Sequence, residues 1–310
     1  MTSPPIQWYP GHIAKAERSL IEQLKKVDVV LEVRDARIPL SSRHPQVATW
    51  IGSKEHVLVL NRVDMIPPQV QQSWTEWFRA QGEQPYFTNA NQGQGISVLL
   101  QATKDTGDRM NRRRRDRGML PRPVRAVVIG FPNVGKSALI NRLLKRKVVN
   151  SARRPGITRQ LRWVRISDQL ELLDAPGVLP SRMEDQEAAL QLAICDDIGE
   201  AAYDNQRVAA AFVDRLKLLQ AQSPEIAFEA PLRSRYGLDP ATITGESFIE
   251  VLAEQRYQGN KERTCVQILN DFRKGLLGAI ALDLPPSHQI ALKELEEEKL
   301  EEEPQEPSPN

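Results

Sequence analysis

The chain has 310 residues, which is long enough for two domains. Hydrophobic residues make up 40% of it and charged residues 26%, as is ordinary for a globular protein. No apolar run reaches the roughly 18 residues that a membrane-spanning helix needs, and the opening residues do not follow the pattern of a signal or transit peptide. The 2 cysteines are too few for a disulfide scaffold, so a cytoplasmic protein is the simplest expectation.

The formal net charge of +2 hides an asymmetry along the chain. The tail at 289–310 is densely acidic and offers little to bury, so we expect it to be disordered. Without this tail the body is basic, with arginines gathered at 112–117 and 153–165. A basic body indicates a polyanionic partner, and nucleic acid is the first candidate.

In chain order, the first two-thirds of the sequence alternate apolar runs with helix-like stretches, which predicts an α/β domain with a mostly parallel sheet. Helical periodicity takes over from about residue 181, so we expect a small all-α domain to follow. The predicted domains are 1–182 and 183–288, followed by the tail. The expected strands are 27–33, 56–60, 85–88, 125–129, 159–166 and 170–173, and the later helices are 184–195, 207–219, 246–256 and 262–277.

Residues 130–137, Gly-Phe-Pro-Asn-Val-Gly-Lys-Ser, join the strand at 125–129 to a helix-like segment. Strand, glycine-rich turn and helix together are the context of a P-loop, whose backbone N–H groups hold nucleotide phosphates. We expect Lys136 to reach the β- and γ-phosphates, as a binding and catalytic residue, and Ser137 to ligate Mg²⁺. The expected phosphate-binding residues are Asn133, Val134, Gly135, Lys136, Ser137 and Ala138.

Two later segments complete the phosphate site. An apolar strand ends in Asp174-Ala175-Pro176-Gly177, where the carboxylate can hold Mg²⁺ through water and the Gly177 N–H can contact the γ-phosphate. Between this motif and the P-loop, Thr158 is the natural second hydroxyl for Mg²⁺.

The candidate motifs for binding the base precede the P-loop in the sequence. A guanine site needs a carboxylate that accepts hydrogen bonds from the base, and Asn61-Arg62-Val63-Asp64 supplies one at a strand end. Asn89 and Ala90 follow the next strand, where a backbone N–H would read the guanine carbonyl. The four motifs are complete once their order is rotated, which predicts a circularly permuted P-loop GTPase that binds and hydrolyses GTP.

In this order the motifs resemble those of the circularly permuted GTPases. The opening at 6–16 and the late segment at 271–278 resemble the ribosome biogenesis GTPase A family, and the resemblance covers nearly the whole chain except the tail. It implies a GTPase, expected as a monomer, that binds precursors of the large ribosomal subunit through their RNA and proteins. The chain departs from the family pattern in having Arg62 for a Lys, Ile13 for a Met and a loose motif at 88–90.

Many GTPases orient the attacking water with a Gln after Asp-x-x-Gly, but that position is Val178, which cannot hydrogen-bond. The resemblance implies that His12 positions the water instead; as alternatives, His12 is a surface residue or an RNA contact. Asn133 is a candidate K⁺ ligand, as in related GTPases, or else an Asn that stabilises the loop.

The arginine run between the last base-side helix and the P-loop strand either binds RNA phosphates or is a solvated linker. Arg273 and Lys274 on the last helix are a weaker RNA candidate. The run consists of Arg112, Arg113, Arg114, Arg115 and Arg117.

Three functions remain open from the sequence. They are an assembly GTPase that binds ribosomal precursor RNA, a GTP-switched signalling protein that acts through protein partners, and a P-loop ATPase. Because the helical segment follows Gly177 almost at once, we expect GTP to shift that segment and to tighten binding to large-subunit precursors.

Overall fold

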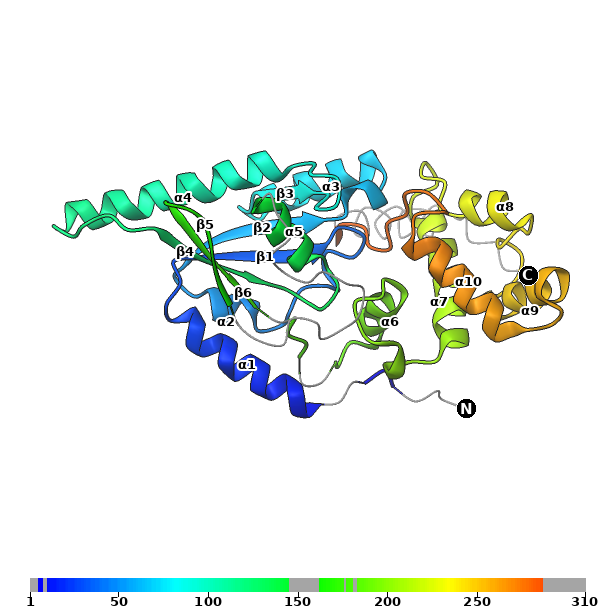
Figure 1. The fold of residues 1–310 in the computed structure, drawn as a ribbon. Helices are drawn as coiled ribbons and strands as arrows, with labels where there is room; N and C mark the ends of the chain where they lie inside the picture. Colours follow the sequence, from blue (N-terminus) through cyan, green and yellow to red (C-terminus); the bar gives the residue numbers. More distant parts are fainter. Residues whose placement is uncertain (1–4, 8–9, 145–161, 176, 181–182, 287–310) are drawn as a thin grey trace, which may run out of the picture.

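The structure of the protein is a computed structural model that describes residues 5–7, 10–144, 162–175, 177–180 and 183–286, without the side chains of 10–16 and 162. Its first half forms a 6-stranded sheet in the order β3-β2-β1-β4-β6-β5 (Figure 1). All neighbouring strands are parallel except β5 and β6. The expected mostly parallel sheet is confirmed. The strands are β1 (Val29–Asp35), β2 (Glu55–Asn61), β3 (Pro85–Thr88), β4 (Val124–Ile129), β5 (Arg162–Ser167) and β6 (Leu170–Asp174).

Helices cover both faces of the sheet, which explains why its central strands are apolar. On one face, Leu20 and Trp50 of two helices pack with Val127 of β4 and Leu173 of β6. The helices of the other face lie against β2, β3, β4 and β6. The first face carries α1 (Pro10–Leu24) and α2 (Val47–Ile51), and the second carries α4 (Ile96–Asp116) and α5 (Lys136–Leu143), with η1 (Val63–Met65) and α3 (Pro68–Ala80) beside β2 and β3.

The arginine run is not a linker. It forms the last turns of α4, a helix of 21 residues, and Arg117 follows as its C-cap. In Figure 1 this end of α4 projects beyond the sheet. The expectation of a solvated linker was therefore wrong, because the helix continues through residues that the sequence analysis assigned to the loop.

The second half is helical in the described residues, as expected. Four of its helices begin with a side chain that accepts a hydrogen bond from the first turn, a contact that stabilises a helix by about 1 kcal/mol. These N-caps are Asp185, Asp204, Thr244 and Asn260. The elements are α6 (Gln186–Ile194), η2 (Glu200–Ala202), α7 (Asn205–Gln222), α8 (Ala230–Tyr236), α9 (Gly245–Tyr257) and α10 (Lys261–Arg273). The sequence analysis missed α8, whose 7 residues are too few to show helical periodicity.

The helical half packs directly on the sheet half. After α10 the chain returns to the sheet, where the Ile280 N–H donates to the Met65 carbonyl and the Leu282 N–H donates to the Arg37 carbonyl, both at 2.8 Å. One hydrophobic cluster runs through both halves. The expected boundary near 181–185 falls between β6 and α6, but the division into domains stays a prediction, and the tail at 289–310 lies outside the described residues. Within the described part of the chain, no helix is long and apolar enough to cross a membrane.

Candidate nucleotide site

The permuted motifs meet at one edge of the sheet. The P-loop strand β4 lies between β1 and β6, so the base-side strands, although first in the chain, complete the sheet on one side of the P-loop. The P-loop follows the end of β4, Asn61 ends β2, Thr88 ends β3 and Asp174 ends β6. Because the carboxyl ends of parallel strands share an edge, all four motifs lie along the same edge of the sheet, which is where open α/β sheets bind ligands.

The P-loop side chains are already held in place. The Lys136 ammonium is buried and donates a hydrogen bond of 2.6 Å to the Phe131 carbonyl. Burial lowers the pKa of Lys136 to about 8, against the opposing influence of Asp174 and Asp197. Burial raises the pKa of Asp174 to about 6, although Lys136 pulls it down. An anionic ligand would favour the charged lysine, so the site is poised to bind phosphate.

Gly177 closes the phosphate site from the side of β6. A Cβ at this position would lie 2.6 Å from the Pro132 nitrogen and 3.0 Å from the Lys136 ammonium. Only glycine permits this close approach, which sets the Asp174-to-Gly177 motif against the P-loop.

Asn61 joins the base motif to the P-loop. Its amide nitrogen donates to the Val134 carbonyl at 2.8 Å, and its amide oxygen accepts from the Thr88 hydroxyl and the Ala90 N–H at 3.1 Å each. Gly135 lies against the same amide, since a Cβ there would be 2.1 Å from its nitrogen, and Gly135 has a φ of +100°. The three strand ends are thus held together by one buried side chain.

The remaining base-side residues are placed as follows. Asp64 lies in η1 with an exposed carboxylate, for which the described residues provide no hydrogen-bond partner. The Ala90 N–H, expected to read the guanine carbonyl, donates to Asn61 instead. Asn89 is buried; its side-chain oxygen accepts from the Asn91 and Gln92 N–H groups, which shapes the loop after β3.

Arg62 contacts the P-loop from the base side. Its guanidinium donates to the Asn133 carbonyl at 2.6 Å and pairs with Asp35 at 3.0 Å. The arginine that stands for the family's lysine thus makes a cationic contact with the P-loop. The backbone of Arg62 is left-handed, with a φ of 65°, and this turns the chain away from β2 at the residue that contacts the P-loop.

Sequence analysis missed a buried cluster of charges behind Arg62. Asp35 ends β1 and pairs with Arg37 at 2.7 Å. Burial alone would raise the pKa of Asp35, but Arg37 and Arg62 beside it hold the pKa below its ordinary value. Asp197, from the turn after α6, is fully buried, and burial raises the pKa of its carboxyl well above the ordinary value. The available signal was the run Glu32-Val33-Arg34-Asp35-Ala36-Arg37, in which charges interrupt an apolar strand.

The turn at the C-terminal end of α6 connects this site to the helical half. Asn133 of the P-loop donates its amide to the Asp196 carbonyl at 2.6 Å, and Arg37 donates to the Cys195 carbonyl at 3.1 Å. From α10, Arg273 donates to the carbonyls of Ala193 and Ile194. These carbonyls belong to the end of α6 and the turn after it, and side chains from three separate elements donate to them.

Arg273 is therefore occupied inside the molecule, with a side chain only 8% exposed. The expectation that it contacts RNA does not agree with this position, whereas Lys274 is exposed. Val134 is buried, and Ser137 and Ala138 are half-buried at the start of α5. His12 lies in α1 with its side chain outside the described residues, and Thr158 lies outside them altogether.

Comparisons with known proteins agree with this architecture. A model of the family described as "50S ribosome-binding GTPase" matches residues 125–226, which begin at the P-loop strand. Ribosome biogenesis GTPase A of Bacillus pumilus is 35% identical over 91% of this chain and 99% of its own length. Mitochondrial ribosome-associated GTPase 1 of Mus musculus is 30% identical over 89% of this chain and 90% of that protein.

Among solved structures, GNP-bound YlqF from T. maritima superposes with a TM-score of 0.59 at 24% identity, covering 87% of this chain and 98% of that chain. This likeness supports the fold alone. The sequence relatives show the family as well, because the match to the Bacillus pumilus protein covers 91% of this chain and so includes both the sheet and the helical half. The chain therefore belongs to the ribosome biogenesis GTPase A family and is a GTP hydrolase with circularly permuted motifs.

Proposed function

We propose that this GTPase is a nucleotide-switched assembly factor that matures the large ribosomal subunit. The relatives named for ribosome biogenesis and ribosome association favour this role over a signalling GTPase or a P-loop ATPase. The observation that carries the proposal is the hydrogen bond from Asn133 to the Asp196 carbonyl. Through it, a residue of the P-loop, where we expect the phosphates to bind, is joined to the helical half, as a GTP switch requires.

In the proposed chemistry, Asp64 accepts hydrogen bonds from guanine and Lys136 binds the phosphates. Mg²⁺ fits the site, because Asp174 presents a buried Oδ1 that has no hydrogen-bond partner among the described residues. Asp174 and Ser137 would hold the ion, together with Thr158, and the bound ion would stabilise charge on the phosphates. His12 remains our candidate for positioning the attacking water.

Asn133 remains our candidate for K⁺. Because its amide nitrogen is used by Asp196, its amide oxygen is the atom left for a cation. A cation held there would add positive charge beside the phosphates, as an arginine finger does. The same contact with Asp196 is compatible with the alternative reading, in which Asn133 only stabilises the loop.

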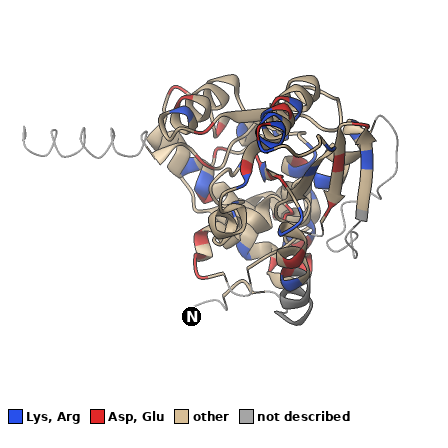
Figure 2. Ribbon diagram, turned by 90° about the vertical axis from the view of Figure 1, so that its left-hand side faces the viewer, with Lys and Arg blue, Asp and Glu red and all other residues tan. Residues whose placement is uncertain are grey.

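We assign RNA binding to the projecting end of α4. Figure 2 looks at this end of the molecule, and Lys and Arg gather on the helix seen end-on. Arg113 pairs with Glu55 at 3.4 Å and Arg114 donates to the Leu120 carbonyl. The side chains of Arg112, Arg115 and Arg117 are exposed and have no ion pair within the part of the chain described by the structure. These three cations are available for RNA phosphates.

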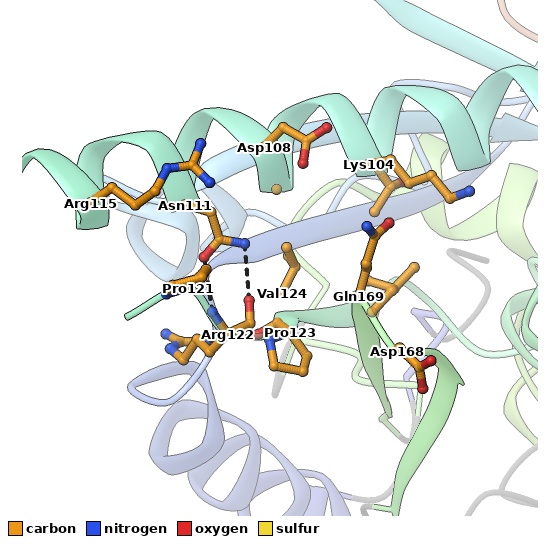
Figure 3. Close-up of a pocket in the computed structure, with 13 residues that line it drawn as sticks. Lys104, Asp108, Asn111, Arg115, Pro121, Arg122, Pro123, Val124, Asp168 and Gln169 are labelled. Atoms are coloured by element: carbon orange, nitrogen blue, oxygen red, sulfur yellow. Dashed lines mark hydrogen bonds between the residues drawn. The ribbon is translucent and has the colours of Figure 1, made fainter. Parts of the chain in front are cut away.

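The same helix borders a hollow of about 290 Å³ (Figure 3). Asn111 lines this hollow. Its amide nitrogen donates to the Arg122 carbonyl at 3.0 Å, and its amide oxygen accepts from the Arg122 N–H at 3.1 Å. Arg115 and Lys104 stand along its α4 side. The last turns of α4 are thus joined to the segment that directly precedes β4, the strand that leads into the P-loop. A partner bound to this helix end would therefore contact an element that is bonded to the P-loop strand's entry.

The experiment is to load the full chain with GDP or a non-hydrolysable GTP analogue and to measure sedimentation with precursors of the large subunit. We expect tighter binding of the analogue form, by about 1–3 kcal/mol. Replacing Arg112, Arg115 and Arg117 by Gln should weaken binding and flatten its dependence on salt, by about 0.9 in slope for each lost contact. Replacing Arg43, Arg79 and Arg263 by Gln is the matched control. Equal affinity of the two nucleotide forms would refute the switch.

A further inference from the structure

The free edge of the sheet carries an exposed aromatic side chain. Strand β5 is the last in the sheet order, and Trp163 on it is 37% exposed. Trp50 and Trp74 are buried, and Trp77 is half-buried. Trp163 is thus the most accessible tryptophan of the described side chains. Figure 1 shows β5, the strand that carries it, at the outer edge of the sheet.

A row of charges crosses the sheet beside Trp163. Glu171 of β6 is paired in register with Arg125 of β4 on one side and with Arg165 of β5 on the other. Residues paired in register share a face, and Trp163 shares it too because it lies two residues before Arg165. The Arg125 guanidinium lies 5.7 Å from the centre of the Trp163 ring. Lys26 adds a third cation from the segment after α1.

These side chains line a hollow of about 470 Å³, within the size range of small-ligand pockets. The hollow offers an aromatic plane, three cations and one carboxylate, and that carboxylate already pairs with Arg125 at 3.3 Å. A ligand that matches this lining has a flat ring to stack and an anionic group to neutralise. A nucleotide unit of single-stranded RNA has both. Arg165 also pairs with Asp168 at 3.1 Å, so Lys26 is the cation of the hollow without an ion pair among the described residues, and an apolar peptide would offer it no counter-charge.

We propose that Trp163, Arg125, Arg165 and Lys26 form a stacking site for an unpaired nucleotide of single-stranded RNA. This inference rests on the proposed function, since ribosomal precursors supply the RNA. The site lies on the opposite face of the sheet from the hollow at α4, because Arg125 and Glu171 line one hollow while their neighbours Val124 and Leu170 line the other. The two RNA contacts therefore straddle one edge of the sheet.

The stacking site is also close to the phosphate motif along the chain. Trp163 is paired in register with Leu173, and the next pair in the ladder is Arg162 with Asp174. A base stacked on Trp163 thus rests on the strand pair that ends at the proposed Mg²⁺ ligand. RNA at this edge is placed to respond to, and to influence, the nucleotide state.

The test uses the full chain and a fluorescein-labelled single-stranded oligouridylate, with a duplex RNA of equal length as the second probe. Loss of a stacked base should weaken single-strand binding of Trp163→Ala by about 5- to 150-fold, with a smaller loss for Trp163→Phe, which keeps an aromatic plane. Leu276→Ala, an equally simple change at an exposed apolar side chain, should bind as the wild type does. Lys26→Gln and Arg165→Gln should each flatten the salt dependence without removing the effect of Trp163.

Quenching of tryptophan fluorescence gives a readout that does not depend on how Trp163→Ala folds. Oligouridylate should quench the wild type, and Trp163→Phe should lose most of that quenching. Unchanged oligouridylate affinity in Trp163→Ala and equal quenching in Trp163→Phe would each overturn the stacking site. If Trp163→Ala lost binding to large-subunit precursors but bound oligouridylate as the wild type does, that result would also overturn the stacking site, in favour of a protein contact. If the wild type binds precursors equally in both nucleotide states, the proposed function fails, and the oligouridylate result still decides the stacking site.

Discussion

Replacement of Asn61 by alanine tests whether one buried amide holds the nucleotide site together. The amide makes three hydrogen bonds, to the Val134 carbonyl, the Thr88 hydroxyl and the Ala90 N–H. Val134, Thr88 and Ala90 are all nearly inaccessible to solvent, with exposed fractions of 0%, 0% and 4%. Truncation therefore leaves a buried carbonyl and a buried N–H without partners, while the Thr88 hydroxyl can rotate towards another acceptor.

Each buried backbone group left without a hydrogen bond costs about 1–3 kcal/mol. Two such groups should lower the free energy of unfolding of Asn61→Ala by about 2–6 kcal/mol, which leaves a domain with about 10 kcal/mol of stability folded. GTP affinity should fall by at least about tenfold, because the P-loop and the base motif lose their common anchor. Urea denaturation measures the free energy of unfolding, provided that the variant and the wild type have the same m-value. Titration with a fluorescent GTP analogue measures the nucleotide affinity.

Two threonine variants complete the experiment. Thr103→Val is the matched control, because Thr103 is equally buried but its hydroxyl donates only to the Leu99 carbonyl within α4. Thr88→Val removes one bond to Asn61, so its effect should shrink in the Asn61→Ala background, with a coupling energy of about 0.5–3 kcal/mol. Wild-type stability and GTP affinity in Asn61→Ala, or strict additivity with Thr88→Val, would refute the anchoring role.

Three further predictions concern the proposed nucleotide chemistry. Asp64→Asn should weaken GTP binding by about 1–3 kcal/mol and shift preference toward xanthosine triphosphate, and competition between the two nucleotides measures this. His12→Ala should lower turnover by about 10²–10⁴-fold with nearly unchanged nucleotide affinity; equal rates on the ribosomal partner would remove it from the mechanism. Because Asp174 must be ionised to hold Mg²⁺ and its pKa is about 6, Mg²⁺-dependent GTP binding should weaken as pH falls through 6, and it should weaken above pH 8 as Lys136 loses its proton. Asp174→Asn should abolish the acid limb, and an acid limb that persists in it would contradict the assignment.

The sequence predicted the strands and the four motifs because each depends on local pattern. Glycine positions, an apolar strand and a polar residue at its end are visible without knowledge of the partners. It did not predict what depends on contacts across the chain. Arg62 meets Asn133, and Arg273 meets the end of α6, across 71 and about 80 residues. An arginine on a predicted helix gives no sign that carbonyls from a distant turn will occupy it.

The charges of β1 show the same limit. A strand that contains Glu32, Arg34 and Asp35 reads as partly exposed, yet all seven of its residues are buried. Burial is possible because Glu32 pairs with Arg34 at 2.6 Å and with His56 at 3.0 Å, while Asp35 pairs with Arg37. Arg34 lies in the strand, Arg37 two residues beyond its end and His56 in β2. The pattern i, i+2 of opposite charges, Glu32 with Arg34 and Asp35 with Arg37, is the signal that the sequence offers.

These buried contacts decide how a nucleotide could move the helical half. Asn61 and Arg62 fix the base side to the P-loop, and Asn133 fixes the P-loop to the turn after α6. The same turn is held by Arg37 from β1 and by Arg273 from α10. A shift of the P-loop backbone at Asn133 therefore pulls on a turn whose other contacts lead to both halves. Because side chains from both halves donate to the carbonyls of this turn, we expect it to move as a unit with the P-loop. Coupling between GTP and the partner would then pass through α6, while β5, next to Asp174, would offer a second route from the edge that carries the proposed stacking site.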